Sequence, residues 1–171
     1  MSAPGTPAQT VGPYLSIGLT WDEGPHVVAA DAPGAVWIRG EIRDGAGEPI
    51  PDALVETWQP DATGRFHQPG FRGLGRCPTG DDGRYAIRTI KPGVVDGQAP
   101  HIDVTVLARG LLHRVVTRIY FADEPTANAA DPVLATVPAE RRGTLIGPVT
   151  EDGYRFDITL QGTDETVFFS L

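Results

Sequence analysis

The sequence predicts an all-β fold, namely a β-sandwich with an N-terminal arm and long loops. About seven short segments alternate between hydrophobic and polar residues, and turn-forming residues separate them at intervals of about 8–12 residues. The 171 residues include 21 glycines and 16 prolines, which suits a turn-rich chain better than a helical one. From this length we expect a single domain over residues 1–171, and a hydrophobic content of 40% is enough for one sizeable core.

Residues 1–20 are expected to form an arm. Residues 1–7 are small and proline-rich, and Thr10, Gly12, Pro13 and Tyr14 follow. Gly12-Pro13 favours an extended turn, because a residue before proline avoids the helical region. This order of residues indicates a segment that docks on another surface, and a plain surface arm is the alternative.

Alternating segments in the first half of the chain predict three strands: Val36–Arg43, Ala53–Gln59 and Arg84–Ile90. Residues 44–51 carry glycine and proline and predict a hairpin turn. Residues 65–79 have no period and are expected to be irregular. The segment Asp81–Gly83 lacks the spaced oxygen ligands of a calcium loop, so we expect a turn there as well.

The second half of the chain mixes strands with short helices. A β-branched strand is expected from His101 to Ala108, and another at Val115–Phe121. Residues 123–131 predict a short helix, and residues 131–142 predict a helical turn that ends before Gly143. Residues 154–160 alternate without interruption and predict one further strand.

Charge and cysteine content exclude several classes of partner. The formal net charge is −8 and Lys91 is the only lysine, so neither a nucleic-acid backbone nor a membrane surface is the expected partner. The single cysteine, Cys77, is expected to be buried and inert. The opening segment MSAPGTPAQT lacks the basic and apolar regions of a signal peptide, and a cytoplasmic location is expected.

The four histidines contain one interesting candidate, His101. It stands two residues before Asp103 on a predicted strand, so both side chains point to the same side. A hydrogen-bonded structural pair is the favoured interpretation, because two ligands are too few for a mononuclear metal site. A stand-alone enzyme using this pair with another metal stays an alternative. His26 and His67 are expected to be solvated, and His113 to be partly buried.

Several segments, taken together, resemble the intradiol ring-cleaving dioxygenases. Their order and spacing cover nearly the whole chain, whereas no single motif is decisive. The segments are Thr10–Tyr14, Leu54–Phe66, Gly73–Arg76, Asp82–Tyr85, Thr89–Gly93, Ala99–Ile102, Thr117–Phe121 and Gln161–Phe169. The resemblance implies the prealbumin-like β-sandwich of that family.

The resemblance also implies a ferric ion held by two tyrosines and two histidines, and this sequence departs from that pattern. Val95 stands at the position of the second tyrosine, and Asp103 replaces the second histidine. The loop of the first tyrosine is shortened to Phe66–Phe71 and contains none. His101 alone matches a ligand. We therefore expect no metal and no catalytic residue on this chain, with Fe(III) on a homologous partner, the beta chain, that keeps all four ligands.

In the two-chain members that the sequence resembles, the chain without iron lines the pocket of its partner. The implied reaction is cleavage of protocatechuate (3,4-dihydroxybenzoate) by O2 to 3-carboxy-cis,cis-muconate, in the beta-ketoadipate pathway of aromatic catabolism. The arm, residues 1–20, would then dock on the partner in an alpha–beta hetero-oligomer. The implied substrate-binding residues are Thr10, Gly12, Pro13, Tyr14 and Arg109.

The residue types at these positions suit an anionic aromatic substrate. Arg109 offers a charge-assisted hydrogen bond to the carboxylate. Gly12 permits close approach because it has no Cβ, and Pro13 stiffens the wall of the pocket. The alternative is a non-catalytic prealbumin-like sandwich that acts as a binding or structural module.

Overall fold

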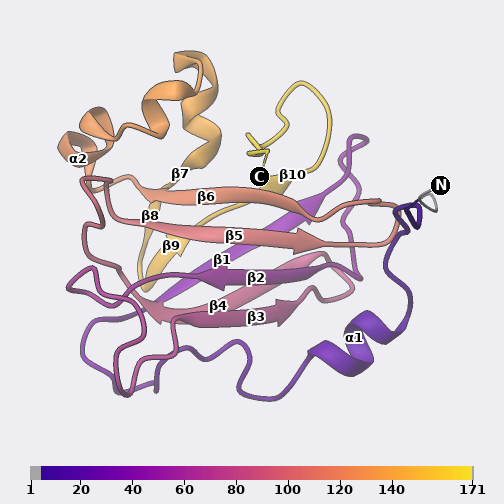
Figure 1. The fold of residues 1–171 in the computed structure, drawn as a ribbon, viewed down its shortest axis with the longest axis horizontal. Coiled ribbons are helices and arrows are strands. Elements are labelled where there is room, and N and C mark those ends of the chain that lie inside the picture. The colour runs from indigo at the N-terminus through magenta and orange to yellow at the C-terminus, as the bar shows by residue number, and fades with distance from the viewer. Residues whose placement is uncertain (1–4, 171) are drawn as a thin grey trace.

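Two five-stranded sheets form the body of the protein, packed face to face (Figure 1). The computed structural model describes residues 5–170, so the first four residues of the predicted arm lie outside the described residues. Short helices and long loops connect the strands. The predicted β-sandwich is confirmed.

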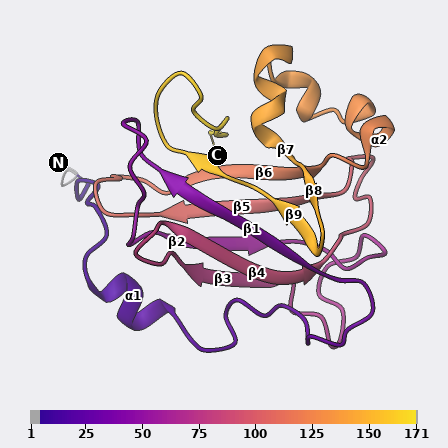
Figure 2. The same cartoon turned by 180° about the vertical axis from the view of Figure 1, so that it is seen from behind.

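The first sheet is built around its longest strand, β1, and faces the viewer in Figure 2. Its strands are β1 (Ala35–Arg43), β4 (Arg84–Ile90), β8 (Val149–Thr150), β9 (Gly153–Arg155) and β10 (Ile158–Thr159). Strand β4 runs antiparallel to β1, whereas β9 and β10 pair with β1 in parallel. The predicted strands at 36–43 and 84–90 are confirmed.

The prediction of one continuous strand over residues 154–160 is wrong, because the chain leaves the ladder between β9 and β10. The Phe156 amide donates to the Arg39 carbonyl at 2.7 Å, and the Glu41 amide donates to the Asp157 carboxylate at 3.1 Å. A Cβ placed on Gly40 would lie 1.7 Å from the Phe156 carbonyl oxygen. The interruption therefore depends on a glycine on the facing strand, which the local alternation does not reveal.

The second sheet has the strand order β3-β2-β5-β6-β7. Its strands are β2 (Leu54–Trp58), β3 (Leu74–Pro78), β5 (His101–Leu107), β6 (Val115–Phe121) and β7 (Ile146–Gly147). Strand β3 lies in the segment predicted to be irregular. Its inward residues are Gly75 and Cys77, so the period of two is present but is not marked by large apolar side chains.

The core lies between the two sheets. Alternate residues of β2 and β5 point inward, among them Val55, Thr57 and Val104, each exposed by no more than 1%. They pack against Ile38 and Ile87 from the first sheet. A second apolar cluster covers one end of the outer face of the β5–β6 sheet, and it consists of Ala99, Tyr120, Leu134, Val137 and Leu145.

Four short helices flank the sheets: α1 (Tyr14–Leu19), α2 (Pro125–Ala130), η1 (Leu134–Thr136) and η2 (Ala139–Leu145). Helix α2 confirms the expected helix at 123–131, whereas η2 continues through Gly143 instead of ending before it. The expected turn at Gly12-Pro13 is present, but Pro13 has helical rather than extended backbone angles. Proline is well tolerated at the start of a helix, and the Leu15 amide donates to the Gly12 carbonyl to open α1. No helix of residues 5–170 could cross a membrane.

Candidate functional site

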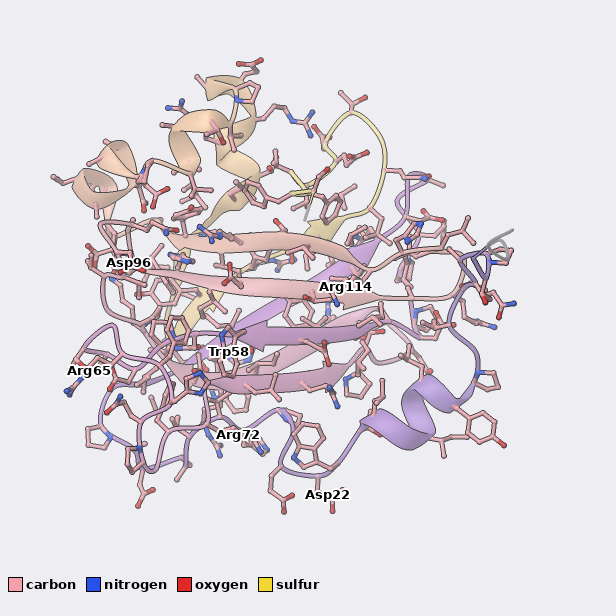
Figure 3. All side chains as sticks on the ribbon, in the orientation of Figure 1. Asp22, Trp58, Arg65, Arg72, Asp96 and Arg114 are labelled. Atoms are coloured by element: carbon pink, nitrogen blue, oxygen red, sulfur yellow. The ribbon has the colours of Figure 1, made fainter. Side chains whose placement is uncertain are left out.

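The residues predicted to matter lie at opposite ends of β5. His101 and Asp103 begin the strand, whereas Arg109 follows its end. Because a strand rises about 3.4 Å per residue, Asp103 and Arg109 are separated by about 20 Å. Figure 3 shows Asp96, next to Val95, at one end of the sheet and Arg114 toward the other.

At the far end of β5, the arm closes on the turn that carries Arg109. The Gly110 amide donates to the Thr10 hydroxyl at 2.8 Å. A pocket with a volume of about 400 Å³ lies beside this contact, and it is lined by Val11, Gly12, Pro13, Leu15, Asp52 and Arg109. The structure therefore brings Gly12, Pro13 and Arg109 together, and Thr10 ties the arm to them.

Neither Thr10 nor Tyr14 lines this pocket, and Tyr14, unlike Thr10, forms no contact with the Arg109 turn that the described hydrogen bonds include. Tyr14 is the first residue of α1, and 79% of its surface is exposed. Ile17, one helical turn later, is 72% exposed. The end of α1 is fixed to the sheet, since Arg76 donates to the Leu19 carbonyl at 2.9 Å.

Asp52 is a pocket residue that the sequence reasoning missed. The Arg109 guanidinium donates through Nε to an Asp52 carboxylate oxygen. Strands β2 and β5 pair Leu54 with Leu107, and the same antiparallel register continued by two residues sets Asp52 opposite Arg109. In the sequence alone, Asp52 is one more polar residue after a hairpin turn, and only the register of the two strands identifies it.

At the near end of β5, the predicted His101–Asp103 hydrogen bond is not formed. The His101 ring is buried, and its Nδ1 donates to the Ala99 carbonyl at 2.7 Å. Asp103 instead accepts a hydrogen bond from Arg118 Nε at 2.8 Å. The reason is the pairing of β5 with β6, which sets Arg118 directly across from Asp103.

Arg118 lies at the centre of a polar cluster at this end. Its Nη1 donates to the Gln98 side chain at 2.6 Å, in addition to the bond with Asp103. Gln98 in turn forms a backbone bridge with Val95. The guanidinium thus links the segment of Val95 with that of Asp103, the two positions at which the family pattern would have a tyrosine and a histidine ligand.

The shortened loop Phe66–Phe71 forms an aromatic cluster over β2. The Phe66 ring stacks on Trp58 with centroids 5.8 Å apart and planes 13° apart, and the His67 ring centroid lies 5.7 Å from that of Trp58. Trp58 pairs across the strands with Asp103. The loop therefore supplies apolar packing at the edge of the Arg118 cluster.

A family model described as Dioxygenase matches residues 12–162. The chain belongs to the intradiol ring-cleavage dioxygenase family. It is 44% identical to the protocatechuate 3,4-dioxygenase alpha chain of Burkholderia cepacia, over 97% of each chain. The corresponding alpha chain of Pseudomonas putida is 40% identical, over 97% of this chain and 96% of that one.

Two further comparisons place the chain within the intradiol dioxygenases. It is 36% identical to the protocatechuate 3,4-dioxygenase beta chain of Burkholderia cepacia, over 75% of this chain and 65% of that one. The dioxygenase domain of a carbohydrate-binding fusion protein from Streptomyces sp. SirexAA-E is a structural neighbour. It has a TM-score of 0.65 and 29% identity, and the match covers 94% of this chain and 100% of that domain.

The side chains of this intradiol dioxygenase chain do not fit the iron of its family. Val95 has no donor atom, and Asp103 is already paired with the fixed cation of Arg118. Within residues 5–170, no three His, Cys, Asp or Glu side chains are grouped so that they could hold a metal ion. His101 is the one matching ligand type, and its ring is bound to backbone.

The remaining candidates have structural or solvent-facing positions. His26 and His67 are exposed as expected, and His113 is exposed although partial burial was expected. Cys77 is buried, and burial raises the pKa of its thiol. A thiol held in the neutral form is a poor nucleophile, which agrees with the prediction of an inert cysteine.

Proposed function

We propose that this chain is the non-metal-binding alpha subunit of an intradiol dioxygenase that cleaves protocatechuate with O2. A homologous beta chain carries the ferric ion, and ring cleavage takes place there. The match to alpha chains over 97% of the sequence supports this assignment, as does the separate, weaker match to a beta chain. The Arg118 cluster supports it as well, because the guanidinium pairs with Asp103 at the position of one of the family's ligands.

The observation that carries the proposal is the distance between the two ends of β5. Arg109 lies about 20 Å from Asp103, from the rise of the strand between them. The pocket at Arg109 therefore cannot serve a metal at the former ligand positions of the same chain. It forms one wall of a site whose remaining wall, with the iron, belongs to the partner.

Each pocket residue then has a role that its chemistry supports. The chain is acidic, with a formal charge of −8, so an anionic substrate needs a local cation, and Arg109 supplies it. Gly12 and Pro13 form a close, stiff wall, and the Thr10–Gly110 hydrogen bond holds that wall against Arg109. Tyr14 and Ile17, exposed on α1, meet the partner chain as part of the docking arm.

The test is reconstitution of the assembly from its two chains. The alpha chain expressed alone should contain no stoichiometric iron and should lack the visible colour of tyrosinate-bound Fe(III). Co-expressed with the beta chain, it should co-purify as an active, iron-containing complex. Iron and tyrosinate colour in the lone alpha chain would contradict the proposal.

Within the same complex, Arg109→Ala should raise the KM for protocatechuate by roughly 10- to 100-fold, which corresponds to one charge-assisted hydrogen bond of about 1.5–3 kcal/mol. Arg114→Ala is the matched control. Arg114 is an exposed arginine on the same end of the sheet that does not line the Arg109 pocket (Figure 3). Equal KM values for the two variants would remove Arg109 from the site.

A further inference from the structure

We propose that Asp52 is a positioning residue that holds the Arg109 guanidinium in the orientation that receives the substrate carboxylate. The inference rests on the proposed function and deepens it. Asp52 and Arg109 line the same pocket, and the carboxylate oxygen of Asp52 accepts from Arg109 Nε. Asp52 itself acts through Arg109 and does not contact the reacting atoms.

The position of Asp52 is built into the sheet. Strands β2 and β5 pair from Trp58–Asp103 to Leu54–Leu107, and Asp52 and Arg109 lie two residues beyond the last of these pairs. Next to Asp52, the Ala53 amide donates to the Thr79 hydroxyl at 3.0 Å, and that hydroxyl donates to the Ile50 carbonyl at 2.8 Å. These two hydrogen bonds fix the backbone on both sides of Asp52, and so they limit where its carboxylate can lie.

The arginine is the less restrained partner of the pair. Its side chain is 72% exposed, against 32% for Asp52, and residues 5–170 give its guanidinium no hydrogen bond other than the one through Nε. An arginine has five N–H donors in a planar fork. With Nε held by Asp52, the outward Nη nitrogens stay available for a bidentate contact with a carboxylate.

Asp52 can affect substrate binding in two opposite ways. Its hydrogen bond orders a long side chain in advance, so that less rotamer entropy is lost when the substrate binds. Its negative charge, on the other side of the guanidinium, weakens the attraction between Arg109 and a second carboxylate. An asparagine separates the two effects, because its amide oxygen still accepts from Nε whereas its charge is zero.

The experiment measures KM and kcat for protocatechuate in the co-expressed complex. Asp52→Ala should raise KM by about 5- to 10-fold with kcat unchanged. The reason is that Arg109 binds the substrate carboxylate equally well in the ground state and in the transition state, so a weaker contact affects binding and not the chemical step. Asp52→Asn should restore KM to within about threefold of the wild type. In an Arg109→Ala background, neither change at position 52 should alter KM further.

Outcomes divide cleanly between the two proposals. If Arg109→Ala raises KM but Asp52→Ala does not, or lowers it, Asp52 has no positioning role and the proposed function stands. If Arg109→Ala leaves KM unchanged, the substrate-binding role of Arg109 and the inference fall together. An equal loss for Asp52→Ala in both backgrounds would indicate a merely structural role. Asp22→Ala, at an exposed aspartate after α1, is the control for loss of a surface charge (Figure 3).

Discussion

Arg109 and Arg118 show that the surroundings of an arginine decide whether it has a structural or a ligand-binding role. Arg118 has a side-chain exposure of 20% and donates to two side chains, Asp103 and Gln98. Arg109 has a side-chain exposure of 72% and donates to one, Asp52. A largely buried guanidinium that binds two neighbouring side chains stabilises the fold, whereas an exposed one with one partner has donors left to bind a ligand.

Restoring one missing ligand type should not restore iron binding. Asp103→His recreates the Pro-His-Ile-His motif, but it sets an imidazole against the Arg118 guanidinium, which then loses its charged partner. We expect no bound iron and a loss of about 1 kcal/mol, or about 2–4 °C in the melting temperature. Metal analysis and thermal unfolding of the purified chain measure both.

Asp103→Asn is the control for this substitution. It keeps an acceptor for Arg118 at a similar volume, so its melting temperature should lie between those of the wild type and Asp103→His. Stoichiometric iron in the histidine variant would show that the Arg118 cluster does not close this end to metal.

Among the elements, the sequence predicts those whose inward face carries large apolar side chains. Strand β4 is an example, because the buried residues Tyr85 and Ile87 alternate with the partly buried Ala86 and Arg88. Strand β3 escapes prediction because Gly75 is one of its inward residues. Its missing side chain gives room to Ile87 and Thr57 from both sheets, which only the packed structure reveals.

The sequence predicts only those residues of the candidate site that belong to a family motif. Thr10, Gly12, Pro13 and Arg109 follow from the family pattern, and the structure brings them together. Partners set by strand register could not be found in this way. Asp52 lies opposite Arg109, and Arg118 lies opposite Asp103, only because of pairings between segments that are distant in the sequence.

The arm is held to the sheet by a contact that a single substitution can remove. Thr10→Val keeps the shape of the side chain but deletes the acceptor for the Gly110 amide. A neutral hydrogen bond contributes about 0.5–1.5 kcal/mol, so the KM for protocatechuate should rise by roughly 2- to 10-fold, less than for Arg109→Ala. Steady-state kinetics of the complex measure this change.

Thr10→Ser is the matched control, since it keeps the hydroxyl and should retain the wild-type KM. Hydrogen exchange gives an independent readout, because the Gly110 amide should lose protection in the valine variant only. Unchanged protection in Thr10→Val would mean that the arm is held by its other contacts, such as that between Arg76 and the Leu19 carbonyl.

On the scale of the whole molecule, the sandwich keeps its two ends apart. Helix α2 lies near one end of the β5–β6 pair, and the arm lies at the other end (Figure 1). Between them, the rigid paired strands β2 and β5 fix the relative positions of Asp52 and Arg109. The paired strands thus act as one frame for the Asp52–Arg109 pair.

The two sheets are also joined by a charged contact at one edge, and this contact predicts an acid dependence. Asp123, after β6, accepts from Lys91 at 2.9 Å and from the hydroxyl of Tyr154, on β9, at 3.0 Å. Burial alone would raise the pKa of Asp123, but hydrogen bonds from Lys91 and Tyr154 outweigh it, and the pKa is lowered. The stabilisation is therefore present above the ordinary pKa of a carboxyl, near 4, and is lost as the pH falls through the lowered value.

Asp123→Asn should consequently lower the melting temperature at pH 7, and the difference from the wild type should shrink as the pH falls below about 4. Thermal unfolding of both proteins between pH 7 and pH 3 measures the effect. Asp22→Asn, at an exposed position, should give no such convergence. A constant difference between Asp123→Asn and the wild type across this range would contradict the charged contact, because loss of packing alone does not depend on protonation.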